Sequence, residues 1–116
     1  MSQAAQEMRQ HAGDAARLLK ALANDRRLLV LCMLAEGERA VGELNTMLDL
    51  SQSALSQHLA VLREEGLVTT RREAQTIHYR ILSAEAVAVM ETLHGLYCGE
   101  PAMAELTDPV DDTQGD

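Results

Sequence analysis

The spacing of the apolar residues changes at Gly66 from the period of a helix to the period of a strand. Before this glycine three leucines recur at i, i+4 and i+7, which is typical of the buried face of an amphipathic helix. They are Leu55, Leu59 and Leu62. After it, residues 67–73 are strand-like and residues 77–82 alternate between inward and outward positions. This period of two predicts a β-hairpin whose strands are joined by Ala74 and Gln75.

The helix predicted before Gly66 has clear ends. Ser51 is a good N-cap, and Leu50 and Leu55 are spaced for a hydrophobic staple. Gly66 follows the last turn, where a left-handed residue is favoured. The face opposite the leucines is short, polar and nearly uncharged, and carries Gln52, Ser53, Ser56, Gln57, Ala60 and Arg63. Short hydroxyl and amide side chains suit a helix that lies in the DNA major groove, although an ordinary solvated helix is also polar.

Four further helices are predicted from apolar stripes and end signals. They run from Ala15 to about Asn24, from Asp25 to Gly37, over about 41–48, and from Ser83 to about Tyr97. Asp25 and Ser83 are the expected N-caps of their helices. A tight turn at residues 49–50 joins the helix at 41–48 to the next one, which makes a helix-turn-helix pair.

The predicted fold is therefore mainly α with a β-hairpin, in the order α-α-α-α-β-β-α. A helix-turn-helix pair followed at once by a two-stranded hairpin is a winged helix-turn-helix. We expect residues 1–13 to form a flexible N-terminal arm, or a short helix that leads into the next one, and residues 14–98 to form the winged-helix domain. Residues 99–116 are acidic, contain two prolines and are expected to be a disordered tail.

The net charge of −8 argues at first sight against a nucleic-acid partner. Residues 99–116, however, hold six acidic and no basic residues, which leaves only −2 on the rest of the chain. Within residues 51–80 there are four arginines and three glutamates. DNA binding would therefore depend on a few well-placed arginines more than on a broad basic field.

The chain is expected to be cytoplasmic and to have no membrane partner. No apolar run approaches the roughly 18 residues of a membrane span, and the polar start does not resemble a signal peptide. In a reducing compartment the two cysteines are free thiols by default, not a structural disulfide.

Two stretches of the sequence resemble the ArsR family of winged-helix repressors. Residues 18–28 (LLKALANDRRL) are similar to the family's opening signature. Residues 51–59 (SQSALSQHL) and 62–68 (LREEGLV) are similar to its recognition helix and the turn after it. The resemblance covers about 14–98 and implies a DNA-binding and dimerisation domain. In that family the first and last helices pair across a two-fold axis, which implies a homodimer on an inverted-repeat operator in double-stranded DNA.

The polar helix face supplies the candidates for reading base edges, because glutamine can bond adenine and serine can bond several bases. These candidates are Gln52, Ser53, Ser56 and Gln57. Arginines on the helix and the hairpin would contact phosphate or the minor groove and fix the register. They are Arg63, Arg71, Arg72 and Arg80. His58 lies on the flank of the helix and is expected to pack or to bond the backbone.

The metal-binding patterns of the family are absent from the sequence. Many ArsR-type repressors sense metals through paired cysteines on the third helix or through Asp, His and Glu on the last. The predicted third helix has no cysteine, and the last has Glu91 and His94 without the upstream Asp-x-His, whose places hold Ile81 and Ser83. No metal site and no cofactor is therefore predicted, and a metal-sensing repressor is kept only as an alternative.

Cys32 lies on the apolar stripe of the second helix, and Cys98 lies at the end of the last. Free cysteines are commonly small buried hydrophobes, so an inert pair is one interpretation. The pair also resembles the persulfide- and redox-sensing subgroup of the family, the SqrR-like, BigR-like and HlyU-like regulators. In that subgroup a cysteine on the second helix and one on the last become linked by a disulfide or polysulfide. The resemblance implies that Cys32 and Cys98 are a redox-sensing pair.

The predicted function is that of a dithiol-based transcriptional repressor, not an enzyme. The reduced homodimer would bind its operator, and reactive sulfur species (persulfide or polysulfide) or oxidants would release it by linking Cys32 to Cys98. An HlyU-like activator or anti-silencer with the same thiol switch is an alternative, as is a winged helix used only for protein–protein contact. A thiol enzyme is disfavoured, because the sequence has no Cys-x-x-Cys motif, acid–base set or glycine-rich phosphate loop.

Overall fold

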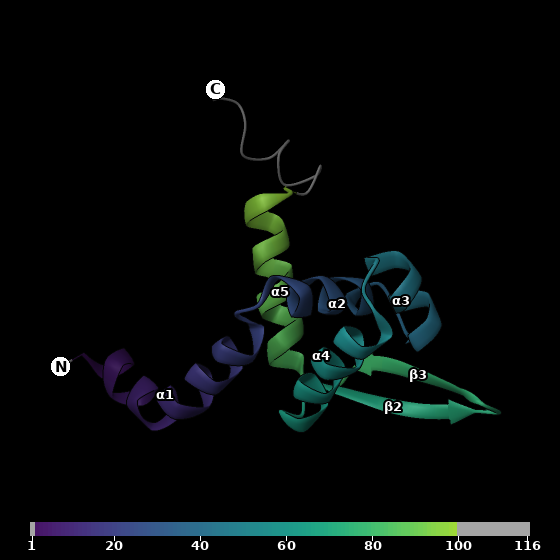
Figure 1. Cartoon of the computed structure of the whole chain (residues 1–116). Helices are drawn as coiled ribbons and strands as arrows, with labels where there is room; N and C mark the ends of the chain where they lie inside the picture. The colour runs from purple at the N-terminus through teal and green to yellow at the C-terminus, as the bar shows by residue number, and fades with distance from the viewer. Residues whose placement is uncertain (1, 100–116) are drawn as a thin grey trace.

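The structure is a computed structural model, and it describes residues 2–99 of the chain. Its elements are α1 (Gln3–Leu22), α2 (Asp25–Ala35), β1 (Arg39–Ala40), α3 (Val41–Leu48), α4 (Gln52–Glu64), β2 (Val68–Glu73), β3 (Thr76–Ile81) and α5 (Ala84–Tyr97). This order confirms the predicted winged helix-turn-helix, mainly α with an antiparallel hairpin (Figure 1). In Figure 1, α2 lies at the centre, α4 and the hairpin lie below it, and α1 extends away to one side.

The predicted N-caps agree with the structure at α4 and α5 but not at α2. Ser51 and Ser83 cap α4 and α5 through their side-chain oxygens, as predicted. The N-cap of α2 is Asn24, not Asp25 as predicted, because the Asn24 side chain accepts bonds of 3.0 and 3.1 Å from the second and third N–H groups after it. Asp25 is instead the first helical residue, where its carboxylate faces the positive end of the helix dipole.

The end of α4 has the geometry that Gly66 predicts. Gly66 adopts a φ of 75°, in the left-handed region. Its N–H donates to the Arg63 carbonyl at 3.0 Å, and the Leu67 N–H donates to the Leu62 carbonyl at 2.9 Å. This pair of bonds is a Schellman motif, which closes the helix and turns the chain directly into β2.

The sheet has three strands in the order β1-β3-β2, all antiparallel. The hairpin register runs from Val68 opposite Ile81 to Glu73 opposite Thr76, and the turn has Ala74 at a φ of 56°. The short strand β1 pairs with the outer edge of β3. The sequence analysis missed β1 because two residues are too few to display a period of two.

One aliphatic cluster forms the core, with contributions from the helices and from β2. Its buried members are Ala21, Leu22, Val30, Leu31, Leu34, Leu44, Leu48, Leu55, Leu59, Leu62, Leu67, Val68, Ala86 and Met90. Among residues 2–99 no polar or charged side chain is buried. Burying one leucine stabilises a fold by roughly 1.5–3 kcal/mol, so the three leucines of α4 fix the orientation of that helix.

Residues 3–13 form the first part of α1 and are helical, where the sequence predicted a flexible arm or a short helix. The α1 helix is continuous from Gln3 to Leu22, and the Ser2 hydroxyl caps it by accepting the Ala5 N–H at 3.1 Å. Within it only Gly13 disfavours a helix. The sequence analysis identified helices from apolar stripes. Residues 3–13 have no such stripe, since the side chains of this part of α1 are exposed.

The disordered tail predicted for residues 99–116 lies, apart from Gly99, outside the described residues. Between residues 2 and 99, no helix is both long enough and apolar enough to cross a membrane.

Truncating a core leucine of α4 should destabilise the protein far more than truncating an exposed one. Leu62 is fully buried, so Leu62→Ala should lower the free energy of unfolding by about 2–5 kcal/mol. Leu82 is 57% exposed, so the control Leu82→Ala should cost only about 0.5 kcal/mol. Urea unfolding followed by circular dichroism measures both, and equal losses would contradict this description of the core.

Candidate DNA interface and thiol pair

The whole predicted reading face of α4 is exposed. Its exposed side chains are Gln52, Ser53, Ser56, Gln57 and Arg63. The opposite face is buried in the core, where Leu55, Leu59 and Leu62 are at most 2% exposed. His58 is half-buried, in agreement with its position on the flank of the helix. The burial of one face thus leaves an outward surface of amides, hydroxyls and a single arginine.

The start of α4 is fixed by the turn that precedes it. Asp49 adopts a left-handed φ of 54° and reverses the chain after α3. The side-chain amide of Asn45, on α3, donates a hydrogen bond to the carbonyl of Leu50. Leu50 in turn packs against the core. The sequence analysis missed Asn45, although an amide one turn before an expected tight turn is a recognisable signal.

An open hollow of about 340 Å³ connects α4 to the hairpin. It is lined by Ser56, Ala60, Arg63, Glu64 and Tyr79. Tyr79 comes from β3, lines this hollow beside α4 and also packs against the core, so it ties the hairpin to α4. Arg63 therefore stands between the reading face and the wing, a place that suits a phosphate contact beside a groove.

The three arginines of the hairpin lie on two different faces. Side chains alternate along a strand, and directly paired residues share a face. The register places Arg72 on the face of Tyr79, toward α4, and Arg71 and Arg80 on the opposite face. Arg72 and Arg80 are exposed. The structure thus separates arginines that the sequence analysis had treated as one group.

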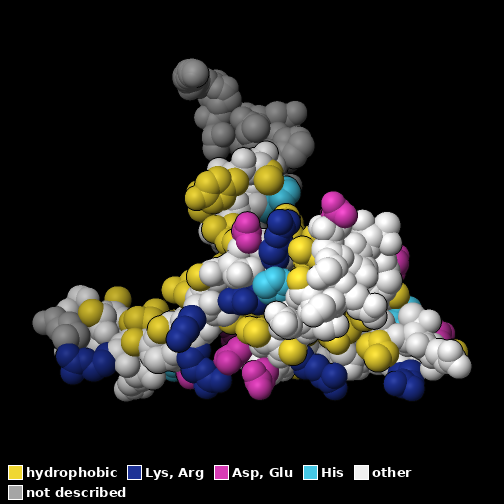
Figure 2. Space-filling view, in the orientation of Figure 1, with side chains coloured by type: hydrophobic (Ala, Val, Ile, Leu, Met, Phe, Trp, Pro, Cys, Tyr) yellow, Lys and Arg dark blue, Asp and Glu magenta, His cyan; other side chains and the backbone are white. Residues whose placement is uncertain are grey.

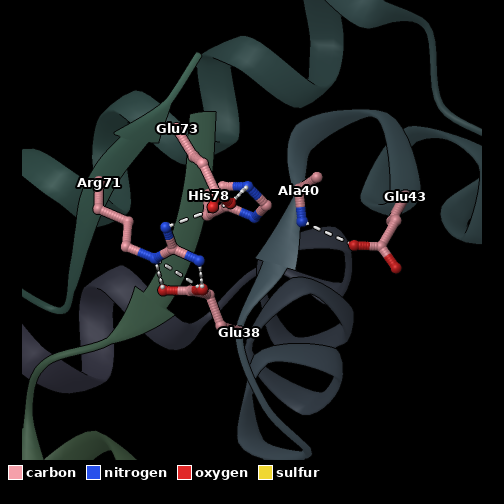
Figure 3. Close-up of polar contacts among 6 residues, drawn as sticks. All are labelled: Glu38, Ala40, Glu43, Arg71, Glu73 and His78. Atoms are coloured by element: carbon pink, nitrogen blue, oxygen red, sulfur yellow. Dashed lines mark hydrogen bonds and ion pairs between the residues drawn. The ribbon is translucent and has the colours of Figure 1, made fainter. Parts of the chain in front are cut away.

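Arg71 is held by carboxylates across the sheet (Figure 3). Its Nε lies 2.9 Å from both carboxylate oxygens of Glu38, and its Nη2 lies 2.7 Å from Oε1. Its Nη1 lies 3.5 Å from Oε1 of Glu73, and the His78 Nε2 lies 3.6 Å from that same oxygen. Glu38 precedes β1 and Arg71 is on β2, so the ion pair passes over β3 and joins the two sides of the sheet.

The ion pair changes the acidity of both partners. The hydrogen bond from Arg71 holds the pKa of the Glu38 carboxyl below its ordinary value of 4.5, and the nearby positive charge of Arg71 adds to the effect. The hydrogen bond to Glu38 likewise raises the pKa of Arg71. Both groups are therefore charged at neutral pH.

Positive charge is dispersed over the surface that includes α4. Figure 2 shows Lys and Arg side chains spaced along the lower edge of the molecule, from α1 past α4 to the hairpin. Asp and Glu side chains interrupt this row near α4. The arrangement agrees with the expectation that a few placed arginines, not a broad basic field, would contact DNA.

The two cysteines are free thiols in unequal surroundings. Cys32, on α2, is half-buried and packs against the core. Cys98 directly follows α5 and is exposed, and its N–H donates to the His94 carbonyl at 2.8 Å. The helices that carry them, α2 and α5, pack against each other. An incoming reagent therefore reaches the Cys98 sulfur more easily than the Cys32 sulfur.

No metal centre is assembled in the described part of the chain. Across residues 2–99, no group of three or more His, Cys, Asp or Glu side chains is placed to hold a metal ion.

Comparison with known proteins identifies one family. Residues 24–70, from the N-cap of α2 into β2, match the model for bacterial regulatory proteins of the arsR family. The transcriptional activator HlyU of Vibrio cholerae is 59% identical over 93 residues, which are 80% of this chain and 86% of that protein. These matches confirm the family resemblance predicted from the sequence.

Solved structures of such regulators share the fold. The transcriptional repressor BigR of Xylella fastidiosa superposes with a TM-score of 0.79 and 40% identity, covering 86% of this chain and all of that one. A homodimeric winged helix-turn-helix DNA-binding domain from Mycobacterium bovis has a TM-score of 0.66 and 33% identity, covering 83% of this chain and 86% of that one.

Acid should remove the stability that the Glu38–Arg71 pair contributes. Because the folded-state pKa of Glu38 is lowered, this contribution is present above the ordinary pKa of 4.5 and is lost as the pH falls through the lower folded value. Thermal unfolding should show that wild type melts at a higher temperature than Glu38→Gln at neutral pH. The difference between their melting temperatures should disappear only in that acid range. A difference that stays constant with pH would contradict the assignment of the shift to this pair.

Proposed function

The chain belongs to the arsR family of bacterial regulatory proteins, and from this we propose that it is a homodimeric transcriptional repressor of an inverted-repeat operator. The observation that carries the proposal is the exposed, nearly uncharged polar face of α4 beside an arginine-bearing hairpin. Such a face can enter the major groove and bond base edges, whereas an active site needs converging catalytic groups. The proposed activity is DNA binding, not catalysis.

The proposed contacts divide into reading and positioning residues. Gln52, Ser53, Ser56 and Gln57 would bond base edges. Arg63, Arg72 and Arg80 would contact phosphates or the minor groove and set the register. The two sheet faces would direct Arg72 and Arg80 to different phosphates.

A second copy of the chain would cover the exposed apolar side chains of α1 and α5. Met8 is 55% exposed and Leu19 58%, both on α1, and at the end of α5 Leu96 is 73% and Tyr97 85% exposed. Apolar side chains that gather into one exposed patch mark an association surface, which the pairing of these two helices would create and cover. The related domain from Mycobacterium bovis is homodimeric, which supports the same assembly here. The dimer would present two α4 helices to the two halves of the operator.

The proposed signal is the linking of Cys32 to Cys98 within a protomer. The exposed Cys98 thiolate would attack the sulfane sulfur of a persulfide, R–S–SH, forming Cys98–S–SH and releasing RS⁻. The Cys32 thiolate would then attack the inner sulfur, forming the disulfide and releasing HS⁻. Where the two sulfurs stay too far apart for a direct bond, Cys98–S–SH would take a second sulfane sulfur from another persulfide, giving Cys98–S–S–SH and RS⁻. The Cys32 thiolate would then attack the middle sulfur, forming a trisulfide bridge and releasing HS⁻.

The link would reach the DNA-reading helix through α2. This helix packs against both α5 and α4, so a bridge between α2 and the end of α5 would shift the support of α4. A coupling of about 1–3 kcal/mol between the thiol site and the operator site gives a 5- to 150-fold change in affinity. Linking would therefore lower operator affinity and relieve repression.

The thiol switch is tested on an operator selected by the reduced protein from random duplexes. A persulfide donor should produce a Cys32–Cys98 cross-link detectable by mass spectrometry and should weaken operator binding about 5- to 150-fold. Cys32→Ala and Cys98→Ala should fold, bind, and ignore the donor. The absence of the cross-link, or a cross-linked protein with undiminished affinity, would refute the switch.

The division of DNA contacts predicts two different mutant phenotypes. Gln57→Ala should weaken operator binding by about 1–3 kcal/mol and relax the sequence preference at one base-pair position. It should leave binding to random duplex unchanged. Arg63→Ala should weaken both, and should reduce the slope of log K against log salt by about 0.9 for each protomer bound. Salt titrations followed by fluorescence anisotropy measure both quantities. Equal losses on both duplexes for Gln57→Ala would argue against a reading role.

An activator with the same switch is the second candidate, because HlyU, at 59% identity, is named an activator. Such a protein would act by displacing another DNA-binding protein. A footprint over the promoter core favours the repressor, and a footprint upstream of it favours the activator.

A further inference from the structure

Arg71 is the hairpin arginine whose guanidinium is already occupied. Glu38 engages the Nε and Nη2 edge with contacts of 2.7 to 2.9 Å, and Glu73 lies 3.5 Å from Nη1. A guanidinium binds carboxylate or phosphate best through two parallel N–H groups of one edge. The edge that Glu38 uses is therefore not available to a phosphate while the pair is intact.

Glu38 is held in place by the segment that leads into α3. It lies two residues before Ala40, whose N–H donates to the Glu43 carboxylate at 2.9 Å in the first turn of α3 (Figure 3). Ala40 also pairs with β3. The Glu38 side chain is only 27% exposed, compared with 50% for Arg71. Glu38 thus has the less exposed side chain and lies beside a fixed backbone segment, and the Arg71 side chain reaches across the sheet to it.

Moving Arg71 to a DNA phosphate would exchange one charge-assisted contact for another without a net gain. It would also leave the Glu38 carboxylate unpaired close to an anionic backbone, which like-charge repulsion opposes. Neither Arg72 nor Arg80 forms an ion pair with a carboxylate in the described part of the chain, although the charge of Arg80 also lowers the pKa of Glu38. The structure therefore distinguishes Arg71 from the arginines proposed to bind DNA.

We propose that Glu38 limits the number of phosphate contacts that the protein makes, by keeping Arg71 off the DNA backbone. The proposal rests on the proposed DNA-binding function and changes the role predicted for Arg71 from the sequence. Phosphate contacts supply nearly all of the affinity for random DNA, whereas the face of α4 reads bases without charge. Withholding one arginine per protomer lowers this sequence-independent part of the affinity on any duplex. The pair also fixes β2 to the segment before β1.

The test compares four full-length proteins: wild type, Glu38→Gln, Arg71→Gln and the double variant. Each is titrated with salt on the selected operator and on a random duplex, with fluorescence anisotropy as the readout. Glu38→Gln keeps the side-chain shape and removes the charge that holds Arg71. It should steepen the slope of log K against log salt on random duplex by about 0.9 for each protomer bound, and tighten random binding at low salt. Raising the salt from 50 to 200 mM should therefore lower the variant's binding constant for random duplex by a further factor of about three to four per protomer, compared with wild type.

The other variants show whether a changed slope comes from the release of Arg71 by Glu38 or only from the change in net charge. Arg71→Gln alone should leave the salt slope at the wild-type value, and the double variant should return to it. Glu7→Gln, on the exposed N-terminal half of α1 at the opposite end of Figure 1 from the hairpin, removes the same charge and should leave the slope unchanged.

Two results would overturn the proposal. One is an unchanged slope for Glu38→Gln. This result includes the case in which a displaced hairpin weakens binding to both duplexes without changing the slope. The other is a slope lowered by about 0.9 per protomer in Arg71→Gln, which would place Arg71 on a phosphate in the wild type. Failure of the proposed function itself would look different, because wild type would then show no salt-dependent binding to either duplex.

Discussion

The packing of α2 at the centre of the domain is the contact on which the other elements depend. This helix touches α1, α3, α4, α5 and β3, and its Val30 and Leu31 are fully buried. Close-packed interiors transmit displacement instead of absorbing it. The neighbours of α2 include the helix proposed to read DNA and the helix that ends at Cys98. Because Cys32 lies on α2 itself, the proposed covalent change at this cysteine would act on the common support of both.

Charge is scarce on the surface proposed to meet DNA, and its placement therefore matters more than its amount. The reading face of α4 contributes one arginine, and the chain as a whole carries −8. The strand register sends the hairpin arginines to two faces, and Glu38 engages one of them. In the proposed complex, an acidic protein arranged in this way would have only a small sequence-independent part of its affinity for DNA.

Local patterns predicted most of the fold, and long-range contacts account for what they missed. The helix at 41–48, the Ser51 and Ser83 caps and the hairpin turn each depend on residues close together in sequence, and all were predicted. The strand β1 forms only because β3 is beside it. Similarly, Glu38 and Arg71 are 33 residues apart, so no periodicity could pair them. The reading face needed only the burial of its opposite side, and its exposure was correctly predicted.

The central claim is that the thiols control DNA binding by moving α4. It is tested most directly by the distance between the two α4 helices of a dimer, measured by pulsed electron paramagnetic resonance. The spin label would be carried by a noncanonical residue in place of the exposed Glu64, which leaves both cysteines untouched. Treatment with a persulfide donor should shift this distance in step with the loss of operator affinity. An unchanged distance in a protein that has released its operator would contradict the account.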